Sequence, residues 1–358
     1  PHRFKIVRHV APTKRGRYHD VKETAVKNLR PLMKVVFRGP VTEDEIAPYS
    51  ALVDQATREG ESFHRGMQIA LSAMLVSPRF LFRVETPFDG GEANEFGDLP
   101  LSQHQLATRL SYFLWSSTPD QSLLDQADRG QLNSDRLKNQ VGRMLKDEKA
   151  DAMASNFAAQ WLGLRSLAEH EADAKRFPTF DDSWKSARPR ETELLFMHVL
   201  RNNLSVSEFL RADYSFVNAK LAGHYGVTFE GQGFRKVSLA DTPRRGILSH
   251  ASVLTLTSTP NRTSPVLRGK WILENVLGTK APEPPAGVPE LEQGNTASEN
   301  ATLREQLELH RQSPTCASCH RVMDQLGFGL DDFDAIGQYR RGVLPLVVPQ
   351  TLIQFNAE

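Results

Sequence analysis

The chain has 358 residues, in which 44 Lys and Arg nearly balance 43 Asp and Glu, and 39% of its residues are hydrophobic. This length predicts two or three packed units, and the balanced charge gives no indication of a nucleic-acid partner. No stretch reaches the roughly 18 unbroken apolar residues that a membrane-spanning helix needs. We therefore expect a globular protein with no membrane span in this chain.

Helix signals begin early in the sequence. Thr42 and Glu45 have the spacing of a capping box, which predicts that a helix starts there. A second helix is expected over residues 62–76, because its apolar residues recur at helical spacing, and Pro78 should end it. The polar and glycine-containing residues 90–100 predict a linker.

The middle of the chain also has helical patterns. Pro178 and Pro189 bracket a predicted loop before a strongly amphipathic segment. Residues 226–237, where apolar residues stand among glycines, are the only candidate for a short β-hairpin. Helices are expected at residues 102–114, 123–127, 135–145, 152–162 and 191–201.

The final third contains helices expected at 247–256, 264–277 and 302–311. In the second of these, Pro265 lies in the first turn and Gly278 just past the end, which is the usual asymmetry of a helix. The sequence thus predicts a mainly α-helical protein, a multi-helix scaffold with a C-terminal module. Its expected parts are an N-terminal helical segment (1–95), a central helical domain (96–235) and a C-terminal domain (236–358) with a Pro-rich connection (279–300).

The two cysteines of the chain fall within one five-residue window. Cys316, Cys319 and His320 form the Cys-x-x-Cys-His pattern that attaches a c-type haem. Two thiols one helical turn apart can reach the two vinyl groups of the porphyrin, and the adjacent histidine can ligate the iron. We therefore predict haem c as the cofactor, with His320 as the proximal iron ligand.

Two other interpretations of the cysteines compete with haem attachment. A thioredoxin-like redox pair would follow a strand, whereas a predicted helix and Ser313-Pro314 precede this one. A zinc site would need a second Cys or His pair at a suitable spacing, and the sequence has no further cysteine.

The second axial ligand of the iron is the harder question. Met323 lies one turn after His320, so on a continuous helix it falls on the proximal side and is not expected to ligate. An upstream histidine is the alternative. His250 is the first candidate and an expected metal ligand, followed by His224 and His310. Each can equally be a core or surface histidine.

Arg262 and Arg268 are predicted to contact the haem propionates, because a guanidinium group pairs with a carboxylate through two hydrogen bonds. Both can also be ordinary surface arginines.

Several longer segments resemble a known family, the secreted planctomycete-type multidomain cytochromes, which are built from a series of conserved domains of unknown function. The haem module is similar over residues 303–307, 310–311, 316–320, 323–324, 326–330 and 333–337. The preceding domains are similar over residues 38–42, 75–81, 110–115, 119–120, 221–226, 245–248, 254–258, 261–265 and 268–271. The sequence departs from the family at Gln325, where the family usually has Pro, and in the tail 343–358.

The resemblance implies haem and export, and it implies no settled activity. Haem attachment takes place outside the cytoplasmic membrane in bacteria, so we expect the protein in the periplasm or at the cell surface. Three function classes follow: an electron carrier that serves redox partner proteins, a haem-dependent oxidoreductase of peroxidase-like type, or a haem-bearing structural subunit of a larger complex.

Overall fold

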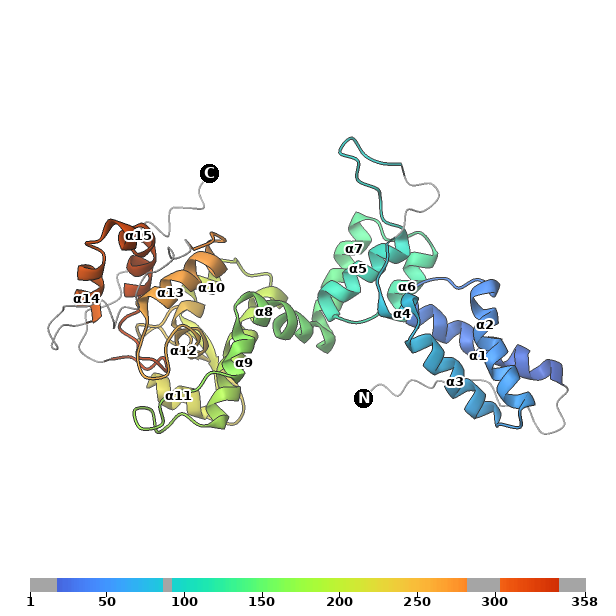
Figure 1. The fold of residues 1–358 in the computed structure, drawn as a ribbon, viewed down its shortest axis with the longest axis horizontal. Coiled ribbons are helices and arrows are strands. Elements are labelled where there is room, and N and C mark those ends of the chain that lie inside the picture. Colours follow the sequence, from blue (N-terminus) through green and yellow to red (C-terminus); the bar gives the residue numbers. More distant parts are fainter. Residues whose placement is uncertain (1–17, 86–91, 282–302, 341–358) are drawn as a thin grey trace. The chain divides into compact units, whose positions relative to one another are not determined.

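The computed structural model describes residues 18–85, 92–281 and 303–340, and these are mainly helical (Figure 1). They divide into two compact units, one that ends at Met153 and one that begins at Ala154. The predicted mainly α-helical class is confirmed. The division into three parts at residues 95 and 235 stays a prediction.

The first unit begins with three helices that share an apolar core, in which Leu29, Ile46 and Val53 are fully buried. The capping box of Thr42 and Glu45 is present and starts the second of these helices, as predicted. The elements of this unit are α1 (Tyr18–Val36), α2 (Glu43–Arg58), α3 (Phe63–Leu75), α4 (Pro78–Leu81), α5 (Gln103–Trp115), α6 (Gln121–Asp128), α7 (Ser134–Lys146) and the 3₁₀ turn η1 (Glu148–Ala150).

The second unit surrounds a core that includes Leu195, Val253 and Phe333. A π-helical segment, η2 (Met153–Ala158), leads into it. Its elements are α8 (Ala159–Trp161), η3 (Leu164–Ala168), α9 (Asp182–Arg201), α10 (Glu208–Arg211), β1 (Tyr214–Val217), α11 (Ala219–Tyr225), β2 (Arg235–Ser238), η4 (Ile247–Ser249), α12 (Ala251–Leu256), α13 (Pro265–Trp271), η5 (Ile272–Val276), α14 (Leu303–His310) and α15 (Pro314–Phe328).

Two sequence expectations about this unit were wrong. The strand β2 pairs antiparallel with β1, so residues 226–237 do not form a hairpin of their own. Pro189 lies inside α9 instead of in a loop before it, because Asp181 caps the helix by accepting a hydrogen bond from the backbone N–H of Trp184. Proline removes one backbone donor, and the helix continues through it.

The helix expected at 247–256 is interrupted at His250, whose backbone is extended and separates η4 from α12. The one expected at 264–277 is α-helical only to Trp271 and then continues as the π-helical η5. Most of the Pro-rich connection 279–300 lies outside the described residues. In the parts of the chain that the structure describes, every helix is too short or too polar to cross a membrane.

The crossing of α13 and α15 fixes the end of the fold that carries the cysteine motif (Figure 1). A Cβ added to Gly269 would overlap the carbonyl oxygen of Met323, and one added to Gly327 would overlap the carbonyl oxygen of Pro265. Each helix therefore places a glycine against the backbone of the other. Such contacts let two helices approach more closely than larger side chains allow.

Candidate haem site

The cysteine motif occupies the first turns of α15. Pro314 stands at the start of the helix, where its missing N–H costs nothing. Cys316 comes about one turn before the adjacent pair Cys319 and His320, and the Cys316 side chain is half-buried. The helix thus supplies the spacing that two thioether bonds and an adjacent iron ligand require.

His320 is held by a carboxylate on the next turn. Its Nδ1 donates a hydrogen bond to Oδ1 of Asp324 at 3.0 Å, and the Asp324 side chain is fully buried. In the neutral ring, a proton on Nδ1 leaves Nε2 with its lone pair. A histidine that ligates a metal through one nitrogen usually donates from the other to such a partner. The residues present therefore fit a haem at this position.

The ring of His310, from the end of α14, lies against the ring of His320 in an edge-to-face contact with centroids 4.9 Å apart. Burial lowers the pKa of His310, and the neighbouring His320 lowers it further. The structure thus brings together His320 and one of the three upstream histidines that the sequence suggested.

Asp324 belongs to the candidate site through its contact with His320, and no role for it was predicted from the sequence. The signal was present, because residues four apart on a helix lie on the same face and Asp324 is four residues after His320. Met323, by contrast, is buried in an apolar cluster with Leu273 and Ala281. That Met323 is not an iron ligand stays a prediction.

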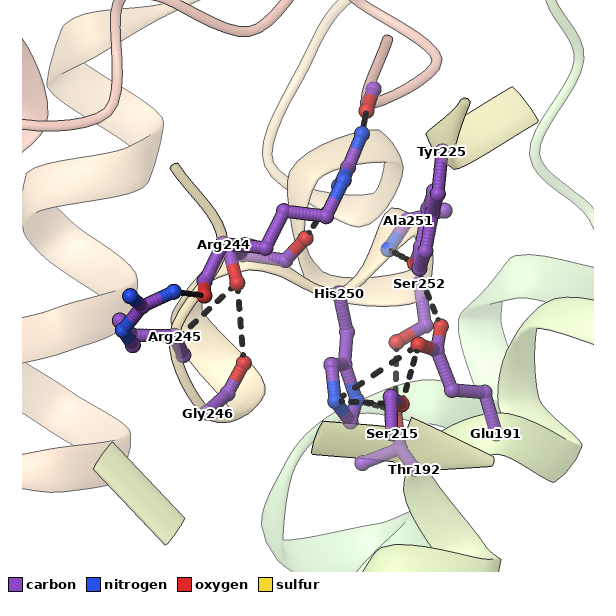
Figure 2. Close-up of polar contacts among 12 residues, drawn as sticks. Glu191, Thr192, Ser215, Tyr225, Arg244, Arg245, Gly246, His250, Ala251 and Ser252 are labelled. Atoms are coloured by element: carbon purple, nitrogen blue, oxygen red, sulfur yellow. Dashed lines mark hydrogen bonds and ion pairs between the residues drawn. The ribbon is translucent and has the colours of Figure 1, made fainter. Parts of the chain in front are cut away.

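A buried polar network lies elsewhere in the second unit, centred on the fully buried Glu191 (Figure 2). Its carboxylate accepts hydrogen bonds from Ser215 Oγ at 2.6 Å and from Tyr225 Oη at 2.6 Å. Tyr225 Oη in turn accepts the backbone N–H of Ala251 at 2.8 Å. The network joins α9, β1, α11 and α12.

His250 is part of this network, and only 1% of it is exposed. Its Nδ1 lies 2.9 Å from Thr192 Oγ1 and its Nε2 lies 3.3 Å from Ser215 Oγ (Figure 2). The single proton of Ser215 goes to Glu191, so Nε2 of His250 must donate to Ser215. Nδ1 then accepts from Thr192, whose oxygen accepts from Ser252 at 2.7 Å.

Every polar atom of a neutral His250 ring is therefore satisfied within the protein. Burial lowers the pKa of His250, Glu191 raises it and Arg244 lowers it. Ligation of iron would require Nε2 to exchange its contact with Ser215. The role of His250 as axial ligand stays a prediction.

His224 and the two arginines also have protein partners. His224 Nε2 donates to the carbonyl oxygen of Ile336 at 3.1 Å, and its ring contacts Trp184. Arg268 is 1% exposed and donates to the carbonyl oxygens of Phe333 at 3.0 Å and Asp334 at 2.8 Å.

Arg262 is half-buried in the loop between α12 and α13. The contacts of Arg268 serve to fix the chain that follows α15. Propionate binding by Arg262 and Arg268 remains a prediction.

Three family models match the chain in series. PSD5, a protein of unknown function (DUF1595), matches residues 24–85, and PSD4, a protein of unknown function (DUF1592), matches residues 101–227. PSCyt3, a protein of unknown function (DUF1588), matches residues 244–342 and so includes α15 with the whole cysteine motif. No curated protein and no solved structure matches the chain. With these domains in series, the chain belongs to the planctomycete-type multidomain cytochrome family.

Proposed function

We propose that the chain is a c-type cytochrome that carries one haem, bound covalently through Cys316 and Cys319 with His320 as the proximal iron ligand. The hydrogen bond from His320 Nδ1 to the buried Asp324 carries this proposal. It leaves Nε2 with a free lone pair on the same helix as the two cysteines. The cytochrome-like name of the family model over residues 244–342 supports it.

Haem iron would supply the chemistry, taking up and releasing one electron. The protein's part is to hold His320 in one tautomer and orientation, through Asp324, and to hold α15 against α13. Arg268 adds to this rigidity, because it ties the carbonyl oxygens of residues 333 and 334 to α13. Electron transfer between redox partner proteins outside the cytoplasmic membrane is the function that such a fixed site serves best.

The same hydrogen bond favours one second candidate, a haem-dependent oxidoreductase of peroxidase-like type. A carboxylate partner raises the basicity of a ligating imidazole, which favours oxidised states of the iron. The two candidates differ at the sixth coordination position. A carrier has a ligand there in both oxidation states, whereas an oxidoreductase has a vacant or displaceable position.

The test is expression of the chain in an exporting bacterium that attaches haem, followed by mass spectrometry of the denatured protein. We expect the mass of the polypeptide plus one haem. The variant Cys316→Ser should keep a single thioether bond through Cys319 and show a shifted visible spectrum. A bare polypeptide with two free thiols in the wild type would contradict the proposal.

Visible spectra of the reduced protein with and without CO then separate the two candidates. An unchanged spectrum supports the electron carrier, because a protein ligand fills the sixth position. A spectrum that shifts with CO supports the oxidoreductase.

A further inference from the structure

The Asp324 side chain is completely buried, but only one of its two carboxylate oxygens accepts a hydrogen bond from the part of the chain that the structure describes. Its Oδ1 accepts the hydrogen bond of His320, but its buried Oδ2 has no hydrogen-bond partner among the described residues. Among the described residues, the guanidinium of Arg311 approaches this oxygen, with Nε 3.7 Å from Oδ2, beyond hydrogen-bond distance. The carboxylate therefore directs its one hydrogen bond at the proximal histidine.

A buried carboxylate acts strongly on its neighbours, because little water is present to screen its charge. Hydrogen bonds to an ionised acceptor are roughly twice as strong as those between neutral groups. By attracting the Nδ1 proton, the carboxylate makes Nε2 of His320 a better electron donor. A stronger donor stabilises ferric iron more than ferrous iron.

From this geometry we infer that Asp324 is a positioning residue that also lowers the reduction potential of the iron bound by His320. The inference rests on the proposed function, since it needs a haem at His320. It goes beyond that function by giving the sign of the effect: the carboxylate favours the oxidised state of the iron and so lowers its reduction potential. Protein levers on the potential of a haem include hydrogen bonding next to the axial ligand.

Arg311 opposes this effect only in part. Its side chain is 21% exposed and makes no hydrogen bond to the carboxylate, whereas Asp324 is fully buried. A partly exposed cation is screened by water, so the charge of Asp324 dominates at His320. Removal of the two charges should therefore shift the potential in opposite directions.

The test compares midpoint potentials of the haem-loaded full chain in three variants. Asp324→Asn keeps an oxygen that can accept from Nδ1 and removes the charge. We expect the ratio of reduced to oxidised iron at a fixed electrode potential to rise at least tenfold, which equals about 59 mV for one electron. Arg311→Gln should lower the same ratio. The control Asp331→Asn removes a half-buried charge from the chain just after α15, and it should change the ratio little.

Resonance Raman spectra give a second measurement, which should stay unchanged if the role of Asp324 is purely structural. In a five-coordinate ferrous form, the iron–histidine stretching frequency reports the donor strength of His320, and it should fall in Asp324→Asn. If Asp324→Asn does not accumulate with haem, the comparison of Arg311→Gln with Asp331→Asn and the wild type carries the test.

The two proposals fail in different ways. Covalent haem with an unchanged potential in Asp324→Asn, or shifts of the same sign in Asp324→Asn and Arg311→Gln, would overturn the role of Asp324 and leave the cytochrome proposal intact. A wild-type chain without haem would overturn both.

Discussion

Gly269 of α13 lies directly against the backbone of Met323 of α15, with no space for a Cβ between them. The contact places the proximal end of the candidate site on a rigid support, because Met323 is three residues after His320 on the same helix. Gly327 repeats the arrangement one turn later, against Pro265.

Gly269→Ala should therefore destabilise the protein. The added methyl group must separate two backbones, and overpacking of this kind costs about 1–3 kcal/mol or more. Chemical denaturation monitored by circular dichroism measures the change. The matched control is Gly223→Ala on α11, where a Cβ meets nothing within 4 Å. That variant should be neutral or gain up to about 1 kcal/mol from helix propensity.

Met323→Leu should leave the iron coordination unchanged and cost less than about 1.5 kcal/mol, because the two side chains have similar volumes in an apolar cluster. Near-infrared spectra of the oxidised protein check this, since ligation by methionine gives a characteristic charge-transfer band. Loss of such a band in the variant would show that the sulfur reaches the iron and that the placement of Met323 in the core is wrong.

His250→Ala should lower the free energy of unfolding by about 1–3 kcal/mol, because the buried Thr192 hydroxyl loses the acceptor of its proton and Ser215 loses a donor. The same variant tests the axial role of His250. If His250 is the sixth ligand, the reduced variant should bind CO while the wild type does not. His250→Gln is the matched control, since its amide can still donate to Ser215 but is a poor iron ligand. CO binding by the wild type would rule out His250.

Stability should fall as the pH is lowered from 7 to 5. Burial, and then the charge of Arg244, lower the pKa of His224 from 6.5 to about 3. Between these values the unfolded chain binds a proton that the folded chain does not, so unfolding becomes easier as the pH falls. One such group contributes up to about 2 kcal/mol over this range.

Denaturant titrations at pH 7, 6 and 5 measure this dependence. The variant His224→Gln keeps a donor for the carbonyl oxygen of Ile336 and should show a shallower dependence on pH. The exposed His64, changed to Gln, serves as the control and should keep the wild-type dependence. An equal slope in all three proteins would contradict the assignment.

Much of the helical structure was predictable because its signals are local. Thr42 and Ser102 cap helices through side chains that bond three residues ahead, a pattern visible in any short window of sequence. The cysteine motif is equally local, and so its position on a helix could be expected. The contact between Asp324 and His320 could also have been predicted, because residues four apart lie on the same face of a helix.

The features that could not be predicted from the sequence depend on contacts between segments that are far apart in the chain. The strand β2 finds its partner about twenty residues upstream, so its own neighbourhood predicted a hairpin that does not form. Glu191 is fully buried because hydroxyl groups from β1 and α11 reach it. No sequence pattern in α9 predicts those partners. The same hydrogen-bond network also explains how His250 can be buried.

The glycine contacts between α13 and α15 also decide where a truncated haem module can begin. A fragment that started after the Pro-rich connection would keep α14, α15 and the whole cysteine motif. It would lose α13, and the backbone surface around Met323 and Gly327 would have nothing to pack against. The smallest fragment that folds on its own must therefore start before Pro265. The close contact between the backbones of α13 and α15 sets this boundary, which lies well upstream of the residues that would attach the haem.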